Sequence, residues 1–297
     1  MQSDGVEANI KTYGKLMEAA AQVGDVHATK KWLEELRASC FTPDVDHYNM
    51  MARAHFKAQN FLAGRQWLFE ETFRDRLAPD IVSYNELLAA LGELGDQNAA
   101  ADMLLEAQEQ RLTPNLLSYN AAIHSCAQCG DAAGARSRLE EIRAAQLAPD
   151  ATSYNSLLHA LARSSDVRGA QGCFEEMKDA AIRPDAFSRA SLIRAASAKP
   201  KGAAEAEALL EKFLLESTDV GLVGYSAVVD AFAKAGMGRQ ARKWFGLALE
   251  ARLQPDVVMY NSVINSCTKE GRQDDADVSR SRELQLSPGC RRTIWPR

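Results

Sequence analysis

The chain has 297 residues, of which 46% are hydrophobic and 25% charged, so it is long enough for a sizeable core and typical of a globular protein. Its 35 Lys and Arg against 40 Asp and Glu give a net charge of -5, which disfavours nucleic-acid binding through bulk positive charge. The short apolar stretches exclude a transmembrane helix, and six cysteines are too few for a disulfide framework and indicate a reducing compartment. Residues 1–7 show neither a signal-peptide nor a transit-peptide pattern.

Two residue series recur along the chain with a common period of 35 or 36 residues. The first consists of tyrosines, with Arg189 in the one slot that lacks a tyrosine: Tyr13, Tyr48, Tyr84, Tyr119, Tyr154, Tyr225 and Tyr260. The second consists of an acid or amide that follows a proline: Asp44, Asp80, Asn115, Asp150, Asp185 and Asp256. Because the two series are independent, their shared period indicates an internal repeat.

The period divides the chain into repeats that each begin three residues before the tyrosine slot. The expected repeats are 10–44, 45–80, 81–115, 116–150, 151–185, 186–221, 222–256 and 257–289, preceded by a partial repeat at 1–9 and followed by a tail at 290–297. Residues 1–289 then form a single array. The partial repeat leaves open that the chain is a piece of a longer protein.

Each repeat is expected to form two helices. In 116–150, apolar residues from Leu117 to Cys126 follow a helical period, Gly130 interrupts them, and a second apolar series runs from Ala135 to Ile142. Glycine accepts the left-handed conformation that ends many helices, and the Pro-Asp turn stops one helix and caps the next. A helix pair cannot bury its apolar stripe alone, so neighbouring pairs must stack into an α-solenoid with a superhelical curve.

Two repeats depart from the common pattern. The 36-residue repeat 45–80 is expected to carry its extra residue in the turn around Ala58–Ala63. Repeat 186–221 has Arg189 and Ala190 in place of the Tyr-Asn pair, and Lys199–Gly202 loosens its inner turn.

The motifs inside the repeats resemble those of the pentatricopeptide repeat family. The resemblance is carried by the Ser-Tyr-Asn stretches at Ser83–Asn85, Ser118–Asn120 and Ser153–Asn155 and by the turns Thr113–Asn115 and Arg183–Asp185. The tetratricopeptide repeat has a 34-residue period, and its Trp, Leu-Gly and Tyr signature is absent from the first helices. The expected fold class is all-α: an α-solenoid, a right-handed superhelix of about eight helix-turn-helix repeats, similar to the P-type arrays of the family.

The resemblance implies sequence-specific binding of single-stranded RNA, about one base per repeat. In the family, each base is read by the residue after the tyrosine slot together with the last residue of the repeat. Carried onto this chain, the pairs that resemble uracil readers are Asn49 with Asp80, Asn120 with Asp150 and Asn155 with Asp185. Asn85 with Asn115 resembles a pyrimidine reader, and Ser226 with Asp256 resembles a guanine reader.

The remaining reading positions are incomplete. Asn261 has an uncertain partner, while Gly14 and Ala190 offer no reading side chain. The implied RNA is therefore pyrimidine-rich, with a core near 5′-UYUU-3′.

Two further rows are implied by the resemblance. The base-stacking residue is the second of each repeat and falls on Val82, Leu117, Thr152, Phe187, Val223 and Val258, whereas Lys11 and Asp46 weaken the first two repeats. The cation near the RNA backbone, at the end of the first helix, falls on Lys57, Arg163, Lys234 and Lys269. To reconcile RNA binding with the acidic net charge, we expect a basic inner row against acidic outer helices such as those holding Glu34–Glu35 and Glu140–Glu141.

These assignments have simpler alternatives. Helix capping explains an Asp or Asn after proline, but it explains an Asn inside a helix less well because Asn is a mediocre helix former. The tyrosines are expected to pack between helices with a bonded hydroxyl. His124, Cys126 and Cys129 lack the second ligand pair that a zinc site needs, so no metal site or cofactor is expected.

No catalytic motif occurs in the chain, so the sequence predicts a protein that is not an enzyme. By resemblance it would act as a monomer on organellar transcripts, in mitochondria or chloroplasts, in RNA processing, stability, editing or translation. It could take protein partners in RNA processing, and no membrane association is expected. Two alternatives stay open: a helical-repeat scaffold for protein–protein interaction, favoured by the acidic charge, and the specificity part of a longer RNA-processing enzyme.

Overall fold

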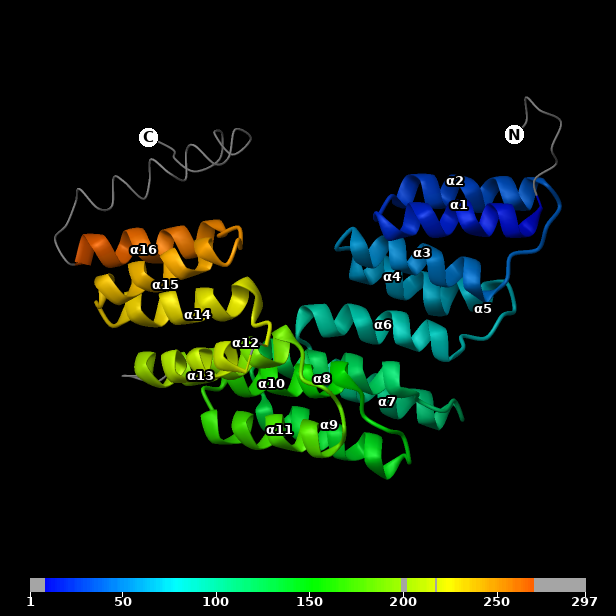
Figure 1. Cartoon of the computed structure of the whole chain (residues 1–297). Coiled ribbons are helices and arrows are strands. Elements are labelled where there is room, and N and C mark those ends of the chain that lie inside the picture. The colour runs from blue at the N-terminus through cyan, green and yellow to red at the C-terminus, as the bar shows by residue number, and fades with distance from the viewer. Residues whose placement is uncertain (1–8, 199–201, 217, 270–297) are drawn as a thin grey trace. The chain divides into compact units, whose positions relative to one another are not determined.

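The computed structural model describes residues 9–198, 202–216 and 218–269, and within them it contains helices and no strand (Figure 1). Residues 1–8, the end of the predicted repeat 257–289 and the tail 290–297 lie outside the described residues. The chain divides into two compact units, residues 1–129 with 134–148, and residues 130–133 with 149–297. Each unit is described by itself.

The first unit is built from helix pairs that follow one another along the chain. Its helices are α1 (Ile10–Gln22), α2 (Val26–Ala38), α3 (Val45–Lys57), α4 (Phe61–Gln66), the π-helical turn η2 (Trp67–Glu71), α5 (Thr72–Arg74), α6 (Ile81–Leu94), α7 (Gln97–Glu109), α8 (Leu116–Cys129) and α9 (Ala132–Ala144). The first helices of successive repeats pack on one another in the order α1, α3, α6, α8, and α2 and α7 pack on α1 and α6 (Figure 1).

The second unit repeats this arrangement. Its helices are α10 (Ala151–Arg163), α11 (Val167–Asp179), α12 (Ala186–Ser197), α13 (Ala203–Leu215), α14 (Gly221–Lys234), α15 (Gly238–Glu250) and α16 (Val257–Lys269). The first helices pack in the order α10, α12, α14, α16, while α11, α13 and α15 each pack on the first helix of their own repeat. Helix pairs stacked on helix pairs confirm the predicted all-α solenoid architecture within each unit.

The Pro-Asp turns start the first helices as expected. Asp80 Oδ1 accepts the Ser83 backbone N–H at 2.9 Å, and the Ser83 hydroxyl returns the contact by accepting the Asp80 N–H at 3.2 Å. The same reciprocal capping box joins Asp150 to Ser153 and Asp185 to Ser188. These bonds satisfy backbone donors that the first turn of a helix leaves open, so capping is confirmed for the Asp and Asn residues that follow proline.

Glycine ends several first helices in the left-handed conformation. Gly24, Gly95 and Gly130 have φ values of 74°, 73° and 79°, as the sequence predicts for the turn inside a repeat. The turn between repeats does the same without glycine: Arg111 and Ala181 have φ values of 60° and 58°. Residues with a Cβ disfavour the left-handed conformation, so the backbone after the second helix is strained in these repeats. The residue types at these positions do not indicate this strain.

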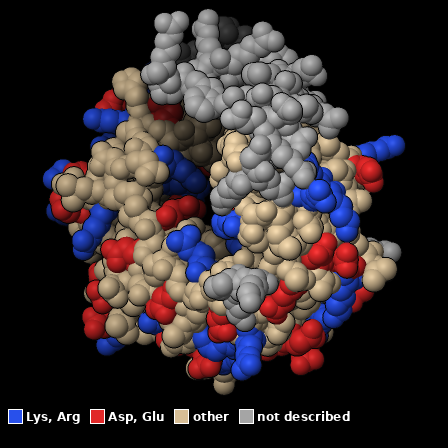
Figure 2. Space-filling view, turned by 90° about the vertical axis from the view of Figure 1, so that its left-hand side faces the viewer, with Lys and Arg blue, Asp and Glu red and all other residues tan. Residues whose placement is uncertain are grey.

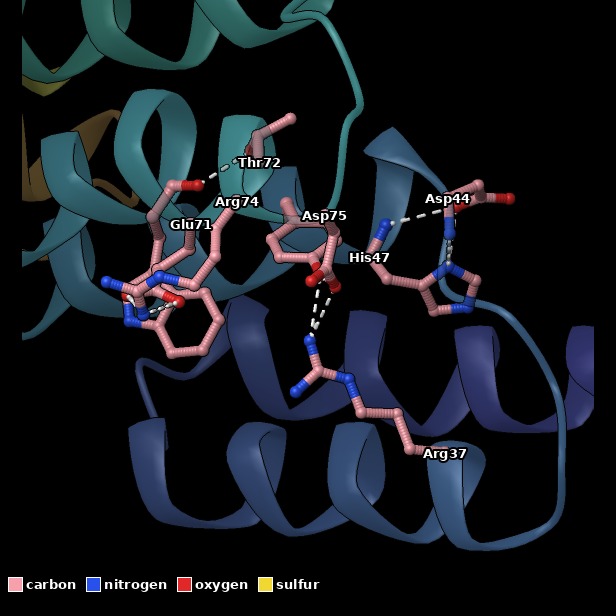
Figure 3. Close-up of polar contacts among 9 residues, drawn as sticks. Arg37, Asp44, His47, Glu71, Thr72, Arg74 and Asp75 are labelled. Atoms are coloured by element: carbon pink, nitrogen blue, oxygen red, sulfur yellow. Dashed lines mark hydrogen bonds and ion pairs between the residues drawn. The ribbon is translucent and has the colours of Figure 1, made fainter.

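The tyrosine series forms the buried seam between helices. All seven tyrosines are buried, which confirms their predicted packing role. Tyr48 in α3 shows how a hydroxyl is satisfied: Arg37 from α2 donates to it at 2.8 Å, and the hydroxyl donates to Asp75 after α5. Arg37 also pairs with Asp75 at 2.8 Å (Figure 3). Burial, followed by the Asp75 hydrogen bond, raises the pKa of Tyr48 to about 12, so the hydroxyl stays protonated and bonded at neutral pH.

The extra residue of repeat 45–80 lies in its second helix, so its predicted place in the turn around Ala58–Ala63 is wrong. The helix that begins at Phe61 opens into the π-helical turn Trp67–Glu71 and then continues to Arg74. A π-turn takes one additional residue per bulge without ending the helix. The segment contains good helix formers and no proline, so the chain absorbs the insertion inside the helix and keeps its inner turn short.

Arg189 replaces tyrosine in α12 and is buried at 9% exposure. Its guanidinium donates to the backbone carbonyls of Asp219, at 2.7 Å, and Pro184, at 2.8 Å. These carbonyls belong to the turns before α14 and before α12, so one side chain joins two successive inter-repeat turns. A buried guanidinium is tolerated here because it is hydrogen-bonded to fixed acceptors.

Candidate nucleic-acid interface

The first helices present a repeated polar and apolar pair on one face. The predicted stacking residue and the predicted reading residue are three positions apart, so they lie on the same side of their helix. The stacking positions are exposed although they are mostly apolar: Val82 40%, Leu117 61%, Phe187 45%, Val223 42% and Val258 65%. Thr152 is exposed as well. Apolar side chains that recur in solvent at one place of each repeat are typical of a binding surface rather than of a core.

The asparagines of the reading position lie at the edge of this surface, with little exposed area. Asn49, Asn85 and Asn120 are 3%, 6% and 8% exposed, while Asn155 is half-buried and Asn261 is exposed. They are not surrounded by apolar side chains alone, because Asn49, Asn85 and Asn155 are hydrogen-bonded to a serine of the following repeat. A ligand would therefore meet at most one edge of these amides, and the buried Asn49 Nδ2 is out of its reach.

The pair Asn155 and Asp185 is in direct contact. Asn155 Nδ2 donates to Asp185 Oδ2 at 3.0 Å, while Asp185 Oδ1 accepts the Ser188 N–H at 2.8 Å and lies 2.9 Å from the Ser188 hydroxyl oxygen. Burial raises the pKa of the Asp185 carboxyl, but the hydrogen bonds from Ser188 and Asn155 together outweigh it and hold the pKa below its ordinary value. The carboxylate therefore stays charged at neutral pH and fixes the amide beside it.

Two other predicted pairs are arranged differently. Asn85 Nδ2 approaches Asn115 Oδ1 at 3.4 Å, which is a weak contact at the limit for a hydrogen bond. Asn49 Nδ2 is buried without a hydrogen-bond partner among the described residues, and Asp80 Oδ1 is engaged by Ser83. The structure brings the Asn85 pair together, whereas the Asn49 amide nitrogen is buried and is not bonded to Asp80 in the described residues.

The C-terminal reading positions are less complete. The Ser226 hydroxyl is buried and has no hydrogen-bond partner among the described residues, while Asp256 is exposed and caps α16 by accepting the Met259 N–H at 2.8 Å. Asp150 caps α10 through the Ser153 N–H at 2.9 Å. The reading role of each of these residues stays a prediction.

The predicted phosphate-facing row is basic at its described positions but is not uniform in charge. Lys57 and Arg163 are exposed at the ends of α3 and α10. Lys234 pairs with Asp230 one turn earlier in α14 at 2.6 Å, so part of its charge is offset. The side chain of Lys269 lies outside the described residues.

Sequence reasoning missed a second cation on this face. Arg53 follows Asn49 by one helical turn and forms an ion pair with Glu86 of α6. Arg53, Lys57, Glu86 and Glu93 line a cavity of about 210 Å³ between α3 and α6. The i, i+4 spacing from Asn49 through Arg53 to Lys57 was the available signal in the sequence.

The two outer helices predicted to be acidic, α2 and α9, carry both signs of charge, whereas α7 carries Asp102, Glu106 and Glu109 without a cation. Glu35 pairs with Lys31 at 3.8 Å in α2, and Glu141 pairs with Arg138 at 2.7 Å in α9. Figure 2 shows basic and acidic side chains interspersed on the face that it presents. Charge of mixed sign provides no long-range attraction for a polyanion, so any RNA affinity has to come from short-range contacts.

The cysteine cluster has ordinary contacts. Cys126 is buried, and the exposed Cys129 thiol donates to Gln97 Oε1 at 3.2 Å. In the described part of the chain, no group of three or more His, Cys, Asp or Glu side chains could hold a metal ion. Across those same residues, the helices are too short or too polar to cross a membrane.

Comparison with known proteins identifies the repeat. The profile of the pentatricopeptide repeat domain matches residues 1–55, 67–128 and 215–270, a second profile of the PPR repeat family matches 149–197, and a PPR repeat profile matches 117–146. A mitochondrial pentatricopeptide repeat-containing protein of Arabidopsis thaliana is 33% identical over 72 residues, which are 24% of this chain and 12% of that protein.

Solved structures share the fold. The pentatricopeptide repeat protein PPR10, in complex with an 18-nucleotide psaJ RNA element, superposes with a TM-score of 0.80 at 22% identity, over 96% of this chain and 41% of that one. The structure of PPR10 from maize gives a TM-score of 0.52, at 22% identity, over 100% of this chain and 41% of that one. The chain thus spans less than half of the length of these PPR10 structures.

Proposed function

Because the chain belongs to the pentatricopeptide repeat family, whose domain profile matches more than half of its residues, we propose that it binds single-stranded RNA sequence-selectively. About one base is bound per repeat. The protein acts by occupying its RNA and performs no catalysis itself. The RNA complex of PPR10, a solenoid of the same fold, supports this proposal.

The observation that carries the proposal is the exposed apolar row beside the amide row. Val82 and Leu117 are exposed on first helices, three residues before Asn85 and Asn120 respectively. Base–aromatic and base–apolar stacking stabilises single-strand complexes because every base has an apolar face. The amide edge three residues further on then contacts the base edge and gives selectivity, since hydrogen-bond donors and acceptors differ between bases.

The expected target is pyrimidine-rich, with a core near 5′-UYUU-3′ read by repeats 45–80, 81–115, 116–150 and 151–185 in that order. Uracil is the preferred base of the Asn155–Asp185 pair, whose two side chains are in contact. Bulk attraction is weak because the net charge is -5, so affinity depends on stacking and on a few cations such as Lys57 and Arg163. We expect a moderate salt dependence, in line with few phosphate contacts.

The place of action is an organelle, mitochondrion or chloroplast. A mitochondrial relative that is 33% identical over 72 residues supports this proposal. A bound single strand blocks exonucleases and prevents local hairpins, so occupancy alone serves RNA processing, stability, editing or translation. The protein functions as a monomer, with protein partners supplied by the processing machinery.

A binding assay tests the proposal. Affinity is measured for a single strand that contains the predicted core, for a purine-rich strand of equal length and for the duplex of the core. Selective binding of the first strand is expected. Equal affinity for all three, or none for any, contradicts RNA reading and favours the protein-scaffold alternative.

A substitution makes the test specific to one base. Asn120→Thr should shift the preferred base at the position facing repeat 116–150 from uracil toward guanine, as the resemblance to family readers implies. Asn98→Thr on the exposed N-terminal turn of α7, a second helix, is the matched control and should leave the base preference unchanged. Loss of binding to every strand alike after Asn120→Thr, with a lowered melting temperature, indicates damaged folding and not altered reading.

A further inference from the structure

A row of buried serines lies directly behind the reading asparagines. In α6, α8 and α12 the third helical residue is Ser83, Ser118 or Ser188, and each is 0% exposed. The hydroxyl of each serine donates to Oδ1 of an asparagine in the preceding repeat: to Asn49 at 2.7 Å, to Asn85 at 2.5 Å and to Asn155 at 2.5 Å.

The sequence shows that serine at this place goes with asparagine in the repeat before it. Serine follows each of the four asparagines in the order Asn49–Ser83, Asn85–Ser118, Asn120–Ser153 and Asn155–Ser188. Where the preceding repeat has no asparagine, the place is taken by another residue: Gly14 is followed by His47, Ala190 by Gly224 and Ser226 by Met259. The correspondence holds at every complete junction of the array.

Helix capping does not account for this correspondence. His47 completes a capping box with Asp44 as Ser83 does with Asp80, with His47 Nδ1 and Asp44 Oδ1 2.5 Å apart (Figure 3). Asp256 caps α16 by accepting the Met259 N–H, although the methionine side chain cannot complete a capping box. A cap can therefore be made without serine, and the serine has a second reason to be there.

We propose that these serines are positioning residues that set which edge of the reading amide faces the RNA, a role that rests on the proposed function. A primary amide has one acceptor edge and one donor edge, and rotation by 180° exchanges them. A serine hydroxyl at 2.5 Å from Asn155 Oδ1 holds the carbonyl edge inward, and the carboxylate of Asp185, which only accepts, holds Nδ2 on its side. The asparagine then presents an N–H donor to the groove, so it selects bases with an acceptor at that edge.

The contrast at Gly14 supports this assignment. A Cβ built on Gly14 would lie 3.8 Å from His47 Nε2, a nitrogen that is buried without a hydrogen-bond partner among the described residues. The imidazole fills the space that an asparagine and a serine share elsewhere. Repeat 10–44 therefore retains the second reading position, Asp44, but lacks both parts of the oriented amide.

The test removes one hydroxyl and measures base preference. In Ser188→Ala, the affinity difference between uracil and the other bases at the position facing repeat 151–185 should fall by about 3- to 10-fold, the effect of one neutral hydrogen bond. Ser188→Thr retains a hydroxyl and should keep the preference, as Thr12 occupies the same place in α1. Thr12→Ala removes the equivalent capping hydroxyl, which donates to the helix cap Asn9 at 3.1 Å, and should not change the base preference facing repeats 45–185.

The same variants separate this proposal from the proposed function. If the unmodified protein shows no base preference, RNA reading fails. If it does and Ser188→Ala keeps the full preference, only the positioning role is overturned. A second measurement needs no RNA. The side-chain amide protons of Asn155 should exchange with solvent several-fold faster in Ser188→Ala. An unchanged exchange rate also overturns the positioning role.

Introducing the asparagine–serine pair into a repeat that lacks it tests whether the pair creates a base preference. The double variant Gly14→Asn with His47→Ser should create a new uracil preference at the nucleotide 5′ to the core, where Gly14→Asn alone should not. An equal preference in the single and double variants, or none in either, contradicts the requirement for serine. Melting temperatures of all variants monitor folding.

Discussion

Two neighbouring junctions of the second unit share one packing scheme but differ in their polar chemistry. Between α10 and α12, Asn155 hydrogen-bonds to both Asp185 and Ser188, and Asp185 accepts the Ser188 N–H. Between α12 and α14, Ala190 has no polar side chain, and Arg189 instead joins the carbonyls of Pro184 and Asp219. Both junctions stack their first helices.

The difference teaches that packing and reading are separate properties of a repeat. The tyrosine slot lies in the buried seam and also accepts Arg189, whose guanidinium is satisfied by backbone carbonyls. The residue after it is Ala190 in this repeat, and α12 continues through it. Under the proposed function, a repeat can thus lose its reading side chain and keep its packing.

The largest expected effect comes from removing the arginine. Arg189→Ala leaves a cavity and two carbonyls without their donor, so unfolding free energy should fall by about 2–4 kcal/mol. Denaturant unfolding measures the loss. Arg189→Tyr, which restores the side chain found in the other repeats, should lose less.

RNA base preference is the control for that variant. Because Ala190 has no side chain that could read a base, Arg189→Ala should leave the RNA base preference unchanged under conditions in which the variant is folded. A changed preference facing repeats 45–185 would show that packing and reading are coupled after all.

A smaller effect is expected from the two turn carboxylates. Asp185→Ala removes the cap of α12 and should cost about 0.5–2 kcal/mol together with the uracil preference at that repeat. Asp219→Ala is the matched change before α14, where the carboxylate accepts the Gly221 N–H at 2.8 Å. It should cost less and leave base preference intact, and equal effects of the two substitutions would remove the distinction between the junctions.

The two junctions should also respond to opposite extremes of pH. The pKa of Asp185 is held below 3.8 despite the opposing effect of burial, so its stabilisation is present above about pH 4 and is lost as the pH falls through the lowered pKa. Burial, with the nearby charge of Asp219, raises the pKa of Tyr225 above 10, so its stabilisation is present below pH 10 and is lost as the pH rises through the raised pKa.

Hydrogen exchange of the two helix starts at acid and alkaline pH measures these changes. Exchange at α12 should increase first on the acid side and at α14 first on the alkaline side. Asp185→Asn should remove the acid-side increase in exchange at α12 only, and Tyr225→Phe should remove the alkaline-side increase at α14 only. Identical profiles at both helices would contradict the assignment.

The sequence predicts much of the fold because its signals are local. The tyrosine period and the Pro-Asp turns define helices and caps within a few residues, and the exposed second position of each repeat follows from helical spacing. The π-turn at Trp67–Glu71 was not predictable, because an inserted residue fits either a loop or a helix. Nor was the Arg189 contact, since its acceptors are backbone carbonyls that carry no sequence signal.

The candidate site was predictable in part. Position along the repeat places Asn155 and Asp185 near each other, and the structure shows them in contact. The limited exposure of Asn49 and Asn85 was not predictable, because it depends on the following helix packing over them. The serine row was visible in Ser83, Ser118, Ser153 and Ser188, but only the inter-repeat distances give it a meaning beyond capping.

The most direct test of the account replaces the nucleotides of a bound strand one at a time and measures the affinity after each change. Changes at the four core positions, which face repeats 45–185, should each weaken binding, whereas a change at the next nucleotide, facing repeat 186–221, should have no effect. A uniform loss at every position, or a loss at the nucleotide facing Ala190, would contradict reading by individual repeats.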